Sequence, residues 1–243
     1  VTHATAEMQF RTPGTLLGEA HIAFPAGAVS YPLVQDQRDR WHYRSAGMAL
    51  TLDERGLDLS TRILMSNGDQ LVGELTLPGF SPLAADSGQQ PLRGRAQLNI
   101  HDLGIVEALV PEVYDLKGEL GLTLLASGTL DEPGLSGSAY LRDAALRIPR
   151  LGLKVDPINL SARSDGMQTL NFSGDAASGD GRVTLRGRTR LDRSAGWPTT
   201  VTLQGQNLEV SRIPEARVEV SPDLRLTLEH RTLHVTGEVH IPY

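Results

Sequence analysis

The sequence predicts an all-β fold in which a long antiparallel or mixed sheet folds over along its length. Three observations support this class. Apolar and polar residues alternate with a period of two through most of the 243 residues, as half-buried strands require. The 25 glycines and 14 prolines are spread along the chain as turn residues rather than in a collagen-like repeat. Leucine and valine carry the apolar content, whereas aromatic residues make up only 5%.

The alternating runs are short and each has one aliphatic and one polar face. In one of them Leu224, Leu226 and Leu228 alternate with Asp223 and Arg225. Successive side chains of a strand point to opposite sides, so such a run has one dry and one wet face. The clearest runs are 56–65, 94–100, 118–126, 182–191, 199–204, 222–229 and 232–241.

Polar turns separate consecutive runs and suggest repeated hairpins. Asp53–Gly56 and Asp165–Gly166 have the composition of hairpin turns. The spacing of these units drifts along the chain, which favours a sheet that grows strand by strand over a strict solenoid.

Two segments depart from this pattern. Residues 102–110 carry Asp102 at an N-cap position and an apolar stripe at helical spacing, and Pro111 follows, which predicts one short amphipathic helix. Residues 78–91 are rich in proline and small polar residues. They form either one long loop or a linker between a β-sheet block at 1–77 and a second at 92–243, which we expect to be continuous with the first.

The period of two does not separate a closed sandwich from an open trough. The scarcity of aromatic residues, the many glycines that permit bending and the uniformly aliphatic dry face favour a trough with a hydrophobic inner groove. Such a groove suits the acyl chains of a phospholipid, because each buried CH₂ contributes about 0.8 kcal/mol. The predicted groove-lining residues are Leu57, Leu59, Ile63, Leu98, Ile100, Leu120, Leu122, Leu124, Leu146, Ile148, Val183, Leu185, Val201, Leu203, Leu224, Leu226, Leu228, Leu233 and Val235.

Charge and composition narrow the classes of partner. The net charge of −6 argues against nucleic acid, whose phosphates need a basic face. The chain has no cysteine and no apolar run of the roughly 20 residues that span a membrane as a helix. Its first residues do not resemble a signal peptide, so we expect a fragment whose export signal or anchor lies upstream.

No motif of enzyme chemistry is present, and we expect no enzyme, no cofactor and no metal. His234 and His240 share a polar strand face but lie roughly 20 Å apart by strand rise, so surface histidines are the simpler interpretation. A polysaccharide hydrolase would need paired carboxylates on one surface. The acidic residues considered for that role, Asp53, Glu54, Asp131, Glu132 and Asp192, lie mostly in turns.

The sharpest polar feature is a row of arginines on one strand face, comprising Arg182, Arg186, Arg188 and Arg190. These residues are candidate contacts for lipid headgroups or an acidic partner. A soluble sheet face, on which arginine discourages edge pairing, is the alternative that we favour.

The stretches "HDLGIVEALVPEV", "GTLDEPGLSG", "ALRIPRLG", "SGDGRVTLRG" and "VTGEVHIP" resemble the C-terminal region of the TamB family, translocation and assembly module proteins of Gram-negative bacteria that are grouped with AsmA-like bridge-type lipid transfer proteins. The resemblance covers roughly 92–243. It implies a folded-over sheet, called a β-taco, with a hydrophobic groove. It also implies a periplasmic protein anchored in the inner membrane, with membranes at both ends reached through parts outside this chain.

Two functions follow from the groove and the resemblance together. The first is a non-enzymatic bridge that conducts phospholipid between the inner and outer membranes. The alternative is a scaffold that docks the Omp85-type outer-membrane protein TamA and assists autotransporter or outer-membrane protein assembly.

Overall fold

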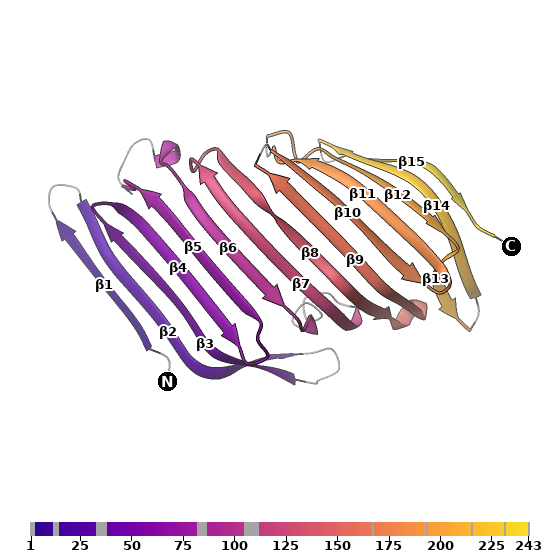
Figure 1. Ribbon diagram of the computed structural model, residues 1–243, viewed down its shortest axis with the longest axis horizontal. Helices are drawn as coiled ribbons and strands as arrows, with labels where there is room; N and C mark the ends of the chain where they lie inside the picture. Colours follow the sequence, from indigo (N-terminus) through magenta and orange to yellow (C-terminus); the bar gives the residue numbers. More distant parts are fainter. Residues whose placement is uncertain are drawn as a thin grey trace. The chain divides into compact units, whose positions relative to one another are not determined.

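A computed structural model describes residues 3–11, 15–32, 38–81, 87–104, 112–166, 168–192, 194–214, 216–230 and 232–242. These residues form β-strands and two short 3-10 helices (Figure 1). The strands are β1 (His3–Arg11), β2 (Thr15–Pro32), β3 (Arg38–Asp53), β4 (Gly56–Met65), β5 (Gln70–Pro78), β6 (Arg93–Ile100), β7 (Tyr114–Gly128), β8 (Pro133–Ile148), β9 (Leu153–Asp165), β10 (Thr169–Ser178), β11 (Gly181–Arg190), β12 (Thr199–Gln206), β13 (Leu208–Ile213), β14 (Ala216–Glu229) and β15 (Thr232–His240), and the 3-10 helices are η1 (Ser87–Gln89) and η2 (Pro149–Leu151).

The strands form one antiparallel sheet, which confirms the predicted all-β class. Strands β1 to β12 follow one another in chain order, β14 pairs with β12, and both β13 and β15 pair with β14. Every strand pairing resolved in the described residues is antiparallel, so the mixed alternative does not apply there. The folding-over of the sheet and its inner groove stay predictions.

The chain divides into two compact units. Unit 1 comprises residues 1–100 and 121–137, and unit 2 comprises residues 101–120 and 138–243. Strands β7 and β8 contribute to both units.

In unit 1 the segment that follows β5 is a connection between neighbouring strands. Strands β5 and β6 pair directly, from Gln70↔Asn99 to Thr76↔Arg93. The 78–91 segment therefore returns the chain to the adjacent position in the sheet, although its residues 82–86 lie outside the described part. A division of the chain into blocks at 1–77 and 92–243 stays a prediction.

The predicted helix at 102–110 falls mostly outside the described residues, which end at Gly104 and resume at Glu112. At its expected start, the side chain of Asp102 accepts a hydrogen bond from the backbone N–H of Gly104 at 3.0 Å. This contact is of the kind that an N-cap residue makes. Leu103, just after Asp102, is buried at 2% exposure.

Fully buried apolar side chains are few in the described residues, and half-buried ones are common. The buried set is Leu52, Leu77, Leu92, Leu103 and Ala144. Strand residues on the aliphatic face are otherwise mostly half-buried and alternate with exposed polar residues, as in β11 and β4. A single layer of sheet explains this pattern, because it covers each side chain from one side and from its cross-strand neighbours only.

Gly56 at the start of β4 provides a test of the tight β3–β4 turn. Its φ is +132°, and an added Cβ would collide with the carbonyl oxygen of Leu77 on β5. Gly68, in the β4–β5 turn, also has a positive φ of +96° but faces open space. We expect Gly56→Ala to lower the free energy of unfolding by about 1–3 kcal/mol more than Gly68→Ala, because strain and collision add. Urea unfolding of both variants measures the difference, and equal losses would contradict the collision.

Candidate functional site

In unit 2 the apolar residues of successive strands line up in rows across the sheet. Each row joins one residue from each of β9, β10, β11, β12, β14 and β15 through the strand register. Because the sheet is antiparallel and in register, every second row faces the same side. The apolar rows are Ile158–Ala176–Val183–Gly205–Pro222–Val239, Leu160–Gly174–Leu185–Leu203–Leu224–Gly237, Ala162–Phe172–Gly187–Val201–Leu226–Val235 and Ser164–Leu170–Thr189–Thr199–Leu228–Leu233.

Three of these four rows contain no polar side chain. The fourth contains three hydroxyls, of which Thr189 and Thr199 share a hydrogen bond of 2.9 Å between their own side chains. The face is therefore an aliphatic surface that spans six strands, or about 24 Å along the hydrogen-bonding direction.

Small and large residues complement one another within the rows. Phe172 on β10 lies opposite Gly187 on β11, and its ring occupies the position that a Cβ of Gly187 would take. Likewise Gly174 lies between Leu160 and Leu185. A large side chain thus covers the backbone of its glycine neighbour, which keeps the apolar surface continuous.

Unit 1 has a similar aliphatic face. Its rows run from β2 through β3, β4 and β5, and three of them continue to β6. A threonine, Thr61, is the one hydroxyl in these rows, and it donates a hydrogen bond of 3.3 Å to the carbonyl oxygen of Gly47. The rows are Gly18–Leu52–Leu57–Leu77, Ala20–Leu50–Leu59–Leu75–Gly94, Ile22–Met48–Thr61–Gly73–Ala96 and Phe24–Ala46–Ile63–Leu71–Leu98.

Most of the residues predicted from the sequence to line a groove lie on these faces and are half-buried. Leu120, Leu122 and Leu124 on β7 are also half-buried. Leu146 and Ile148 are half-buried on either side of the exposed Arg147 on β8. Leu233 and Val235, on the outer strand β15, are 57% and 54% exposed. That these residues line a groove stays a prediction.

Sequence reasoning missed the apolar residues of β9 and β10. Ile158, Leu160, Phe172 and Ala176 complete the rows of unit 2, but serines, glycines and alanines interrupt the alternation around them. Their faces become evident only from the residues opposite them, such as Leu185 and Val183 on β11.

The hairpin of β13 and the first half of β14 crosses one end of the apolar face of unit 2. β13 pairs with residues 216–220 of β14 and also contacts β9, β10, β11 and η2. Gly181 lies on the same face of β11 as Val183 and Leu185. An added Cβ on Gly181 would collide with the carbonyl oxygen of Asn207, which directly precedes β13. The hairpin therefore covers the apolar face where β10 ends and β11 begins.

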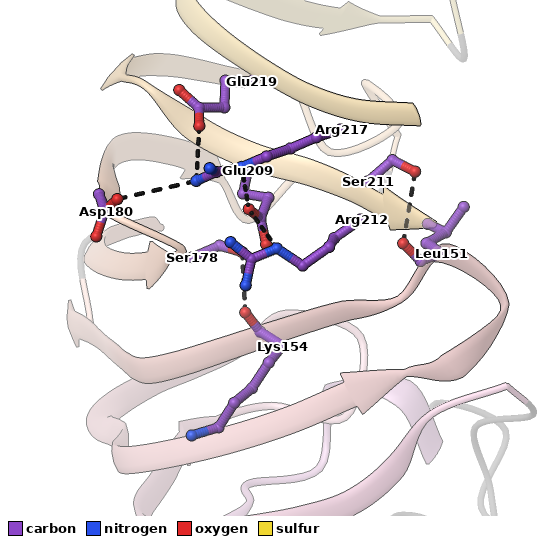
Figure 2. A network of polar contacts seen from close by, with 9 residues as sticks. All are labelled: Leu151, Lys154, Ser178, Asp180, Glu209, Ser211, Arg212, Arg217 and Glu219. Atoms are coloured by element: carbon purple, nitrogen blue, oxygen red, sulfur yellow. Dashed lines mark hydrogen bonds and ion pairs between the residues drawn. The ribbon is translucent and has the colours of Figure 1, made fainter. Parts of the chain in front are cut away.

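A buried carboxylate joins the two strands of this hairpin (Figure 2). The Glu209 side chain is 5% exposed and lies 2.9 Å from Nε of Arg217 and 3.1 Å from Nε of Arg212. Arg217 also contacts Glu219 at 2.9 Å and Asp180 at 3.8 Å. Because a buried charge is costly unless it is paired and hydrogen-bonded, these two guanidiniums compensate the burial of Glu209.

Two hydroxyls make hydrogen bonds near the hairpin, of which Ser178 joins β10 to β9 within the sheet and Ser211 joins the hairpin to η2. Ser178, which is 2% exposed, donates a hydrogen bond of 2.9 Å to the carbonyl oxygen of Lys154. Ser211 on β13 donates to the carbonyl oxygen of Leu151 in η2 at 3.4 Å (Figure 2). The hairpin thus closes one end of the aliphatic face through polar contacts at its margin.

The opposite face of unit 2 is polar, and all four arginines of the predicted row are exposed on it. Nε of Arg188 donates to the side chain of Asn171 at 3.2 Å. Nε of Arg190 lies 3.5 Å from Asp192. The row is therefore partly engaged by neighbours on the same face, and its role as a partner contact stays a prediction.

Asp192 belongs to the turn between β11 and β12. The hydroxyl of Ser194 donates to it at 2.6 Å and the N–H of Ala195 at 3.0 Å. These hydrogen bonds hold the pKa of Asp192 below its ordinary value, with a smaller contribution from Arg190. The carboxylate thus stabilises a turn, which explains its position without a catalytic role.

The remaining candidates for chemistry are dispersed. Asp53 accepts a hydrogen bond from the N–H of Arg55 within its turn at 2.8 Å. Within the described ranges no group of three or more histidine, cysteine or acidic residues is placed to hold a metal ion. No helix in the described part of the chain is long and apolar enough to cross a membrane.

Comparison with known proteins identifies what the chain is similar to. Residues 168–243 match the family model of the TamB C-terminal domain. The chain is also 24% identical over 193 residues to the translocation and assembly module subunit TamB of Haemophilus influenzae, a match that covers 79% of this chain and 14% of that relative. No solved structure matches. The chain is therefore a distant homologue of TamB over most of its length.

Glu209 provides a test of the hairpin that covers the apolar face. We expect Glu209→Gln to lower the free energy of unfolding by about 1–3 kcal/mol, because it removes the buried negative charge that both guanidiniums contact. Glu74→Gln is the matched control, since Glu74 and Arg95 form an exposed pair at 3.5 Å that contributes at most about 1 kcal/mol. Urea unfolding and amide hydrogen exchange of β13 measure both effects. Equal stability of the two variants would show that the hairpin does not depend on Glu209.

Ser194 provides a test of the turn at Asp192. We expect Ser194→Ala to raise the pKa of Asp192 towards its ordinary value, because the largest contribution to its lowered pKa is removed. A lowered folded-state pKa stabilises the fold above the unfolded-state pKa and loses this effect as pH falls through the folded-state value. The variant should therefore lose part of its stability at neutral pH and differ less from the parent in strong acid. Carboxyl titration by NMR measures the shift, and an unchanged pKa would contradict the assignment.

Proposed function

We propose that this chain, a distant homologue of TamB, is part of a non-enzymatic periplasmic bridge whose aliphatic face conducts phospholipid between the inner and outer membranes. In this proposal the chain acts within the translocation and assembly module of a Gram-negative bacterium. A part of the protein outside these residues anchors it in the inner membrane. The observation that carries the proposal is the set of apolar rows in unit 2, three of which cross six strands without a polar side chain.

The chemistry of the face matches the requirements of an acyl chain. Acyl chains need apolar area and make no hydrogen bonds, and each CH₂ removed from water contributes about 0.8 kcal/mol. The face of unit 2 extends about 24 Å across its strands, which exceeds the roughly 15 Å depth of one leaflet of a bilayer. Its residues are half-buried, so ligand tails retain access to them.

A smooth aliphatic surface also favours movement over tight binding. The three apolar rows contain leucine, valine, alanine and glycine with one isoleucine, one proline and one phenylalanine. No polar side chain in these rows would fix the register of a bound chain. Sliding from one row to the next exchanges equivalent contacts, so no deep energy minimum holds the lipid.

The proposal is tested by photo-crosslinking in cells with the probe at Leu185 or at Thr184 of the full-length protein. These neighbours on β11 point to opposite faces, and Leu185 lies in an apolar row whereas Thr184 is exposed on the polar face. We expect phospholipid to be crosslinked at Leu185 and about tenfold less at Thr184. Equal labelling at the two positions, or labelling at Thr184 alone, would refute the aliphatic face as the lipid path.

A second test places a charged residue on the aliphatic face and measures phospholipid delivery. We expect Leu226→Asp to impair phospholipid delivery to the outer membrane, because an ionised carboxylate in an apolar surface must stay hydrated. Arg225→Asp, on the opposite face of β14, is the control and should leave delivery intact. Thermal unfolding of both variants verifies that they fold, and normal delivery by folded Leu226→Asp would contradict the conduit.

The second candidate is a scaffold that docks the outer-membrane protein TamA and assists autotransporter or outer-membrane protein assembly. The observation that favours it is β15, whose nine residues are all exposed and which pairs in the described residues with β14. An exposed strand edge can accept an added strand. Binding of TamA that survives Leu226→Asp but is lost with Thr236→Pro in a folded variant would support the scaffold.

A further inference from the structure

The polar face of unit 2 contains a hollow in which three arginines from different strands meet. Arg142 on β8, Arg163 on β9 and Arg186 on β11 all line it. We propose that this hollow binds a phosphate group, which is the chemistry shared by soluble phosphate esters and the headgroups of phospholipids. The site lies on the face opposite to the apolar rows, so it is separate from the proposed lipid path.

The strand register explains why Arg163 and Arg186 meet. Arg186 lies opposite Ser173 on β10, and Ser173 lies opposite Ser161 on β9. Arg163 is two residues from Ser161, so it points to the same face. Neighbouring strands are about 4.8 Å apart, so the long side chains of Arg163 and Arg186 both reach the space above Ser173.

The three guanidiniums have no carboxylate partner among the side chains that the structure describes. Nε of Arg190 lies 3.5 Å from Asp192 on the same face, whereas no ion pair within the described ranges engages Arg142, Arg163 or Arg186. In a chain with a net charge of −6, three such cations around one hollow concentrate positive charge there. A bound anion would relieve their mutual repulsion.

Tyr140 orients one of the three arginines, and two serines lie beneath them. The guanidinium of Arg142 stacks on the ring of Tyr140, 4.0 Å from its centroid, which restricts its orientation. The hydroxyls of Ser161 and Ser173 lie 3.1 Å apart at the floor of the hollow. One of the two hydroxyls donates to the other, so only the second can donate to a ligand, and the floor is polar without being charged.

Phosphate fits this set of donors better than a carboxylate does. A carboxylate has two oxygens in one plane and is satisfied by one bidentate guanidinium. The terminal oxygens of a phosphate, three in a monoester and two in the diester of a lipid headgroup, point away from a tetrahedral phosphorus and can meet guanidiniums from different directions. Asp143 and Asp175 line an adjoining hollow that also includes Arg142 and Arg186. Asn159 accepts a hydrogen bond from the backbone N–H of Asp143 at 3.0 Å and donates one to the carboxylate of Asp175 at 3.3 Å. Because these two carboxylates line the adjoining hollow and would repel an anion, we expect the anion on the Arg163 side.

The experiment is a titration of the 243-residue chain with inorganic phosphate at low ionic strength, followed by ³¹P NMR. We expect Arg186→Gln and Arg163→Gln each to weaken phosphate binding about tenfold or more, because each removes a charge-assisted contact. Arg182→Gln is the matched control, since Arg182 is exposed on the same strand and face but does not line the hollow. It should bind phosphate like the parent chain.

Two further arms identify the source of the phosphate group. Glycerol 3-phosphate tests a soluble ester, and flotation with phosphatidylcholine vesicles, with and without phosphatidylglycerol, tests a membrane surface. A loss in Arg186→Gln confined to vesicles would assign the site to headgroups. Absence of phosphate binding to the parent chain in every arm would overturn the proposal. An equal loss in Arg182→Gln would also overturn it and would indicate diffuse electrostatic attraction instead. Thermal unfolding of each variant separates lost binding from lost folding.

Discussion

The hydrogen-bonded register between neighbouring strands is the constraint on which the rest of this structure depends. Because side chains alternate with a period of two, a slip of one residue in any pairing would move that strand's leucines to the polar face. In unit 2 the register keeps Leu160, Leu185, Leu203 and Leu224 in one row over five strands. A surface assembled in this way exists only while every pairing holds.

The strands that preserve this register are stabilised by different means on their two faces. On the aliphatic face, large residues cover glycines, as Phe172 covers Gly187. On the polar face, cross-strand hydrogen bonds join facing residues, as between Thr76 and Asp58 at 2.7 Å in unit 1. Individually these contacts contribute little to stability. They recur between successive strands, however, and all of them favour the same strand register.

The hairpin of β13 and β14 shows how the chain ends an otherwise repetitive surface. Pro222 is buried within β14 and lies beside the Gly205 position, where an added Cβ would meet its ring at 3.1 Å. On one side of Pro222 the strand pairs with β12 and β15, and on the other side with β13. Glu209 is then buried between arginines, which is a costly arrangement that a continuing flat sheet would not need. The match of residues 168–243 to the TamB C-terminal domain includes this whole hairpin.

The sequence by itself determined the class of fold, the two chemically distinct faces of most strands and the similarity to TamB, because the period of two is a local property that each segment carries alone. The apolar residues of β9 and β10 could not be identified in this way, since their alternation is weak without the partners opposite them. Only the tertiary structure decided which residues share a row, that β13 covers one end of the aliphatic face, and that Arg142, Arg163 and Arg186 surround one hollow. These features depend on pairing between segments far apart in the chain, and no local pattern specifies which residue of one strand faces which residue of the next.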